Sequence, residues 1–186
     1  MSQHCWYVSY GSNMCLERFR CYLEGGCPPG GRRTYAGARD PAMPRASSPY
    51  WLDGGAYFAM RSRTWGGGMA FLDPATPGRT PARAYLVTRA QLDDVLAQEA
   101  GHYESMMECA NVDGLPAFTF TAARAAPDHR LAPPSAAYLR VLVQGLAETH
   151  AWGLHRSAGY LASLPGARDS WTADDVVAAV AAHARG

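Results

Sequence analysis

Short apolar segments, each bounded by glycine or proline, follow one another through the first half of the chain. They occupy residues 5–8, 55–60, 69–72 and 82–87, and aromatic and β-branched residues are common in them. Runs of this composition and length predict β-strands, and their regular interruption is typical of a small curved sheet or barrel. We also expect a short strand over residues 33–38 and a long surface loop over residues 40–53, which carry several prolines and small residues.

Helical patterns dominate the second half of the chain. Thr88 followed by Gln91 forms a capping box in front of a helix expected over residues 89–100. After an expected strand at residues 116–124, Ser135 can cap the next helix, and a further helical stretch covers residues 154–164. We expect a last helix at about residues 172–185, which packs on the rest of the domain. With 186 residues and 48% hydrophobic content, we expect one α+β domain spanning residues 1–186.

The charge composition excludes several classes of function. A net charge of +1 gives no electrostatic basis for binding nucleic acid. All 17 basic residues are arginines, so no lysine can form a Schiff base or hold a phosphate in a Walker-type loop. The N-terminus lacks the layout of a signal peptide, and no run approaches the length of a membrane span. We therefore expect a cytoplasmic protein without membrane contact.

The spacing of cysteine and histidine predicts no metal site. Cys15, Cys21 and Cys27 recur every six residues and form no closely spaced ligand pair. His150 and His155 are five residues apart, which misses the spacing of two ligands on one helix face. Free thiols in a reducing compartment explain the cysteines.

The segment from Tyr10 to Met14 links the first expected strand to a helical pattern. Its sequence is Tyr-Gly-Ser-Asn-Met, in which Gly11 permits backbone conformations closed to other residues, and Ser12 or Asn13 can cap the following helix. Such a turn directs backbone N–H groups and a helix N-terminus outward, which suits a carboxylate or an oxyanion. An ordinary capped turn is the alternative interpretation.

Glu99 shares a helical stripe with apolar residues. Leu92, Val95 and Leu96 define the expected core face of the helix at residues 89–100, and Glu99 falls on the same face. A carboxylate in such a place must be paired or must have a raised pKa. It is therefore a candidate acid or base, and the alternative is a side chain that bends out to water or pairs with an arginine.

Tyr138 lies in the first turn of the helix that Ser135 caps. Its simplest role is that of a core aromatic whose hydroxyl finds a partner. The chain contains no Gly-x-Ser-x-Gly nucleophile elbow and no complete dinucleotide-binding fingerprint.

Four motifs in one order resemble the γ-glutamylcyclotransferase family. They are the stretch Tyr10–Met14, the glycine-rich stretch Trp65–Ala70, the end of the helix at Leu96–Gly101, and Pro134–Tyr138 followed by Gly145. The sequence departs from the family pattern at Met14, where leucine is common, at Ala100, which is inserted before Gly101, and in the loop at residues 25–53.

The resemblance implies a small mixed β-barrel with helices packed around it and a cavity at its mouth. Family enzymes cleave a γ-glutamyl amide: its α-amine attacks the γ-carbonyl, and 5-oxoproline and an amine are released. By this resemblance Glu99 is the general acid/base, and Gly11, Ser12 and Asn13 bind the substrate through their N–H groups. Tyr10, Met14 and Tyr138 complete the implied substrate site, and no metal or cofactor is required.

Two other functions remain compatible with the sequence. The same site could serve an amide hydrolase or acyl transferase that never forms the lactam. Alternatively, the chain could be a non-catalytic module that binds an acidic small molecule, although an inward carboxylate gives such a binder no advantage. The partner that we expect is a small γ-glutamyl molecule, and the sequence leaves its amine and the oligomeric state open.

Overall fold

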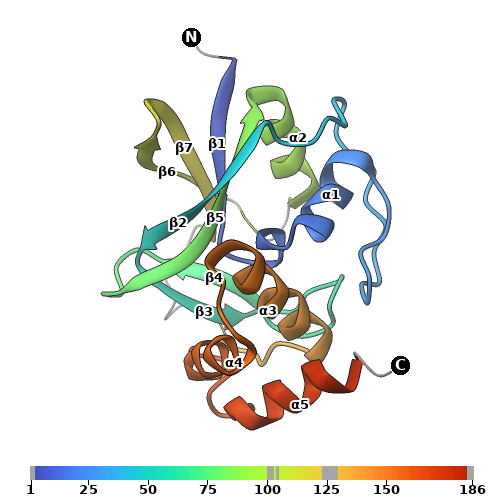
Figure 1. Cartoon of the computed structure of the whole chain (residues 1–186), viewed down its shortest axis with the longest axis vertical. Helices are drawn as coiled ribbons and strands as arrows, with labels where there is room; N and C mark the ends of the chain where they lie inside the picture. Colours follow the sequence, from blue (N-terminus) through green and yellow to red (C-terminus); the bar gives the residue numbers. More distant parts are fainter. Residues whose placement is uncertain (1–2, 100–102, 104, 123–129, 184–186) are drawn as a thin grey trace.

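A computed structural model describes residues 3–99, 103, 105–122 and 130–183 (Figure 1). The strands are β1 (His4–Ser9), β2 (Ala46–Asp53), β3 (Gly55–Ala59), β4 (Met69–Asp73), β5 (Arg79–Thr88), β6 (Ser105–Val112) and β7 (Leu115–Thr121). The helices are the short 3₁₀ helix η1 (Ser12–Met14), α1 (Leu16–Glu24), α2 (Arg89–Glu99), α3 (Ala136–His150), α4 (Leu154–Ser163) and α5 (Ala173–His183).

Strand β1 is the middle of a five-stranded sheet with the order β2-β5-β1-β7-β6. It runs antiparallel to β5, with Cys5 opposite Val87, and parallel to β7, with Tyr7 opposite Phe118. A strand covered on both faces is apolar at successive positions, and β1 is buried from Cys5 to Ser9. The apolar run at the start of the chain therefore becomes the centre of the sheet.

Strands β3 and β4 form a separate antiparallel hairpin. Thr121, at the end of β7, joins this hairpin to the main sheet: its hydroxyl donates to the Leu72 carbonyl at 2.7 Å and accepts from the Leu72 N–H at 3.3 Å. The expected mixed α+β fold is confirmed. The expected barrel is not closed among the described residues, because one side-chain bridge takes the place of a continuous ladder between β4 and β7.

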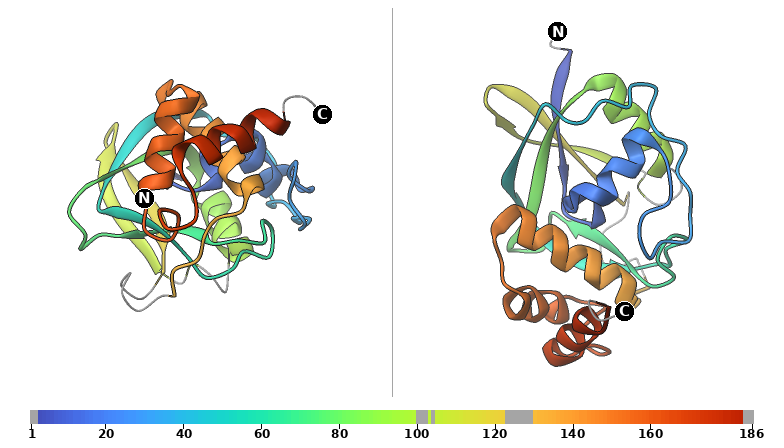
Figure 2. Two further views of the ribbon diagram at one scale, coloured as in Figure 1. Left: turned by 90° about the horizontal axis from the view of Figure 1, so that it is seen from below. Right: turned by 45° about the vertical axis from the view of Figure 1, so that its right-hand side comes forward.

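The helices lie in two groups around the sheets (Figures 1 and 2). Helices α1 and α2 lie on one side of the five-stranded sheet, and α3, α4 and α5 gather at the end of the molecule beside the β3–β4 hairpin. Helix α5 packs against α3 and α4, and its Val176 is fully buried. The described part of the last helix thus packs on the two helices before it. None of the described helices is long and apolar enough to cross a bilayer.

Two sequence predictions about the first loop region are wrong. Residues 46–53 of the expected surface loop form β2, an edge strand along β5 that tolerates Pro49. Residues 33–38 form no strand, and only an isolated bridge joins Gly26 to Tyr35. At residues 46–53 proline and small residues predicted a loop, and at residues 33–38 we expected a strand. In both places pairing with distant segments decides the conformation.

Candidate active site

Residues 10–15, between β1 and α1, form a bend that is fixed from two sides. Arg83 of β5 donates to the Met14 carbonyl at 3.0 Å and forms an ion pair with Glu148 of α3 at 2.9 Å. Glu148 in turn accepts a hydrogen bond from the N–H of Leu16, the first residue of α1, at 2.9 Å. The bend is therefore anchored to both the sheet and α3.

Helix α1 begins without the side-chain cap that the sequence predicts. Cys15 is its N-cap, and neither Ser12 nor Asn13 makes a capping bond. The carboxylate of Glu148 satisfies the first N–H of α1 from outside the segment. Ser12 and Asn13 are thus not used in capping.

Gly11 is needed for space and not for an unusual backbone angle. Its φ of −105° is open to any residue, so the expectation of a special conformation is wrong. A Cβ atom at this position would lie 3.2 Å from the hydroxyl oxygen of Tyr138. Glycine therefore lets Tyr138 approach the bend.

The backbone N–H groups of the bend are free to bind a ligand. Within the part of the chain that the structure describes, the N–H groups of Gly11 and Asn13 have no protein acceptor. The side chain of Asn13 is buried; its Nδ2 donates to the Tyr7 hydroxyl at 3.0 Å, while its Oδ1 has no described partner. The bend thus presents backbone donors and one side-chain acceptor in a small volume.

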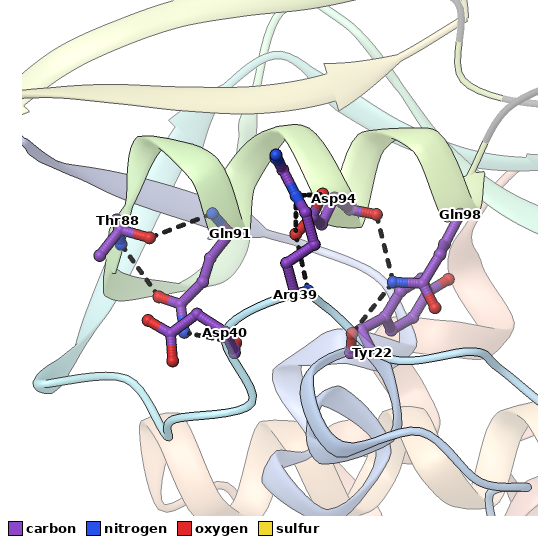
Figure 3. Close-up of polar contacts among 7 residues, drawn as sticks. All are labelled: Tyr22, Arg39, Asp40, Thr88, Gln91, Asp94 and Gln98. Atoms are coloured by element: carbon purple, nitrogen blue, oxygen red, sulfur yellow. Dashed lines mark hydrogen bonds and ion pairs between the residues drawn. The ribbon is translucent and has the colours of Figure 1, made fainter.

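Polar residues spaced along α2 fix this helix to the chain that follows α1 (Figure 3). Thr88 and Gln91 exchange the two hydrogen bonds of the predicted capping box, at 3.1 and 3.0 Å. Asp94 binds the backbone N–H and the guanidinium of Arg39, both at 2.9 Å. Gln98 donates to the Tyr22 carbonyl at 3.0 Å, and it also accepts from the N–H of Gly37. These contacts hold the last turn of α2 against α1.

Glu99 is the last residue of α2, and its side chain is partly buried. Its carboxylate accepts a hydrogen bond from the hydroxyl of Tyr22 on α1. Burial raises the pKa of Glu99 above its usual value, while the bond from Tyr22 and the positive charge of Arg18 oppose this shift. The predicted inward orientation is confirmed, and among the described ion pairs none involves Glu99.

A cavity joins Glu99 to the bend. Its volume of about 30 Å³ has room for a group as small as a carboxylate or an amine. Besides Glu99, the side chains and backbone that line it come from β1, the bend, β7 and the segment before β6: Tyr7, Val8, Ser9, Tyr10, Gly11, Ser12, Asn13, Tyr103, Thr119 and Phe120. The structure thus brings five of the predicted site residues together in the lining of one cavity, namely Tyr10, Gly11, Ser12, Asn13 and Glu99.

The two other predicted site residues, Met14 and Tyr138, are not part of the lining of this cavity. Met14 is buried in the core, where its Cβ faces Gly145 of α3. The hydroxyl of Tyr138 accepts from the Ala70 N–H at 3.3 Å, and burial raises the pKa of Tyr138 to about 12. Neither residue lines the cavity, so their implied contact with substrate stays a prediction.

Six residues that line the cavity are not among the predicted site residues: Tyr7, Val8 and Ser9 of β1, and Tyr103, Thr119 and Phe120. Tyr103 donates to the Ala70 carbonyl at 2.7 Å and so connects the cavity wall to β4. Thr119 and Phe120 enter because β7 pairs with β1, which no local pattern indicates. Among the described residues, no group of three or more His, Cys, Asp or Glu side chains could hold a metal ion.

Sequence comparisons match part of the chain. No family model matches the sequence. Histone deacetylase 5 of Arabidopsis thaliana is 36% identical over 100 residues, which are 52% of this chain but 15% of that protein. The chain therefore spans a small part of this curated relative.

Two solved structures match nearly the whole chain. Uncharacterized protein loc79017 from Homo sapiens superimposes with a TM-score of 0.61 and 18% identity, covering 95% of this chain and 99% of that one. A gamma-glutamyl cyclotransferase superimposes with a TM-score of 0.58 and 17% identity, covering 94% and 98%. The chain therefore has the γ-glutamylcyclotransferase-like fold, as its sequence motifs predict.

Proposed function

We propose that the protein is an enzyme that cleaves γ-glutamyl amides by cyclisation, releasing 5-oxoproline and a free amine. The observation that carries this proposal is the shared cavity of Glu99 and the bend, in which a carboxyl group with a raised pKa faces unpaired backbone donors. The fold shared with a gamma-glutamyl cyclotransferase supports it.

The bend binds and orients the glutamyl group in this proposal. The free N–H groups of Gly11 and Asn13 hold the α-carboxylate or the oxygen of the γ-carbonyl. The unpartnered Oδ1 of Asn13 accepts from the α-amine. The substrate is folded so that its own amine lies against its own γ-carbonyl, and five-membered ring closure then needs no enzyme nucleophile.

Glu99 moves the proton. Its carboxylate takes a proton from the α-ammonium group, and the amine attacks the γ-carbonyl to form a tetrahedral intermediate. Glu99 then gives this proton to the departing nitrogen, and the amide C–N bond breaks. The ring nitrogen loses its second proton to the Glu99 carboxylate, the freed amine takes that proton up, and the lactam remains. A carboxyl group whose pKa is raised by burial suits both steps, because it holds and releases a proton near neutral pH more readily than an exposed glutamate.

Tyr22→Phe is expected to move the acidic limb of the pH–rate profile to higher pH. The Tyr22 hydroxyl donates to the ionised form of Glu99 and so lowers its pKa. Without this bond the pKa of Glu99 rises further, and its base form is populated only at higher pH. The pH dependence of kcat/KM measures the shift. The matched control is Tyr50→Phe, which removes a hydroxyl bonded to the Ala110 carbonyl on β6. An acidic limb that stays in place or moves to lower pH in the Tyr22 variant contradicts the assignment.

Product analysis tests the reaction itself. Purified protein is incubated with a panel of γ-glutamyl amino acids and γ-glutamyl amines, and 5-oxoproline, glutamate and the freed amine are measured. We expect 5-oxoproline from at least one class of substrate. Release of glutamate would instead establish an amide hydrolase, and binding without turnover would establish a binding module.

A further inference from the structure

A second cavity lies beside α1, on the side of α3 and of the loop at residues 28–30. Its volume is about 70 Å³, and none of its lining residues lines the cavity of Glu99. The residues around it are Cys15, Glu17, Arg18, Pro28, Pro29, Gly30, Ala137, Arg140, Val141 and Gln144. The space is large enough for a few water molecules or for one group of the size of a carboxylate or phosphate.

Arg18 is the unusual member of this lining. Its side chain is almost completely buried, with 2% of the residue exposed. Its Nε and Nη1 atoms have no hydrogen-bond partner among the described residues, and no described ion pair includes it. The negative charge of Glu99 acts on Arg18 without forming one of the described ion pairs. Charged donors that are buried without a hydrogen-bond partner cost free energy.

Aromatic rings compensate only part of this cost. The guanidinium carbon lies 4.3 Å from the ring centroid of Tyr22 and 4.2 Å from that of Tyr35. Such contacts stabilise the positive charge through the ring faces but offer no acceptor to the N–H groups. The rings hold the guanidinium in a fixed position while its in-plane donors stay unused, which is the arrangement in which an arginine binds an oxyanion.

The other charges at this cavity favour an anion. Arg140 of α3 adds a second guanidinium, and its Nη2 lies 4.0 Å from the position of a Cβ atom at Gly30. The carboxylate of Glu17 also borders the cavity, but Glu17 is exposed, so solvent screens its charge more strongly than that of the buried Arg18.

We propose that this second cavity binds a small oxyanion, a carboxylate or a phosphate group, through Arg18 and Arg140. The bound anion accepts hydrogen bonds from the unused donors of Arg18 and pairs with Arg140 at the mouth. The two cavities share no lining residue, although the charges of Arg18 and Glu99 act on each other. The site does not depend on the reaction proposed for the catalytic cavity.

Titration with inorganic phosphate and with acetate tests the site. The protein is labelled with ¹⁵N, and the Nε–H signal of Arg18 is followed; an Arg18→Lys variant assigns the signal. We expect a saturable shift of this signal with phosphate, acetate or both, and the stronger of the two ligands identifies the source of the oxyanion.

Variants at the mouth separate a built site from general charge. Arg140→Gln should weaken binding by about tenfold, as expected for loss of one charge-assisted contact. Arg20→Gln is the matched control. Arg20 lies on α1 with Arg18, but its side chain is exposed and paired with Glu24. It should bind like the parent protein. A signal of Arg18 that does not move with either anion, or equal weakening by the two variants, overturns the proposal and leaves water as the partner of Arg18. Because the readout is binding, its failure leaves the proposed reaction untouched.

Discussion

Glu99→Gln is expected to abolish most of the turnover of γ-glutamyl amides while leaving the fold intact. Glutamine has nearly the same shape and can still accept from the Tyr22 hydroxyl, but it cannot carry the proton. Loss of a general acid/base typically costs about 10²–10⁴-fold in rate. Steady-state kcat/KM for the best substrate of the panel measures this loss.

The same variant is expected to be at least as stable as the parent near neutral pH. Burial raises the pKa of Glu99, so the folded state binds its proton more tightly than the unfolded state does. This contribution to stability is full below the unfolded pKa and is lost as pH rises through the folded pKa, and glutamine has no such loss. Thermal unfolding at about pH 7.5 checks this expectation.

Glu108→Gln is the matched control for Glu99→Gln. Glu108 is an exposed carboxylate on β6, and its amide variant should retain parental activity. Parental turnover by Glu99→Gln, or equal losses in the two variants, would remove Glu99 from the mechanism.

Gly145→Ala is expected to destabilise the protein strongly. Gly145 lies in α3 where this helix crosses the bend, and a Cβ atom there would lie 2.7 Å from the Met14 Cβ and 2.8 Å from the Cys15 nitrogen. The Cys15 nitrogen belongs to the backbone, so the close contact is relieved only if α3 or the bend moves. Overpacking of this kind costs about 2–3 kcal/mol, more than the helix propensity that alanine gains.

Chemical denaturation of Gly145→Ala and Gly159→Ala measures this difference. Gly159 lies in α4, and nothing is within 4 Å of the Cβ atom that alanine would add there. Its replacement should stabilise the protein by about 0.5–1 kcal/mol through helix propensity. If Gly145→Ala is as stable as Gly159→Ala, the bend does not pack on α3 as described.

The sequence predicts the local elements of this fold well, since their signals lie within a few residues. The capping pair Thr88–Gln91 forms as its spacing implies, and Ser135 accepts from the N–H of Tyr138 at 3.2 Å. The inward orientation of Glu99 follows from the same helical periodicity.

Pairing between distant segments is what the sequence could not predict. Strand β2 forms because β5 offers an edge, and the bend is anchored by Arg83 and Glu148, which lie more than sixty residues away. The cap of α1 shows the same limit: Ser12 and Asn13 have capping side chains, but Glu148 occupies the helix end. Tertiary contacts override local propensity at these positions.

One labelling measurement tests the central claim most directly. A γ-glutamyl amide with ¹⁵N in its α-amino group is turned over, and the lactam and the freed amine are quantified. Cyclisation at the cavity of Glu99 predicts that the ¹⁵N is retained as the ring nitrogen of 5-oxoproline, with one lactam for each amine released. Recovery of the label in free glutamate, or release of amine without lactam, would contradict the account.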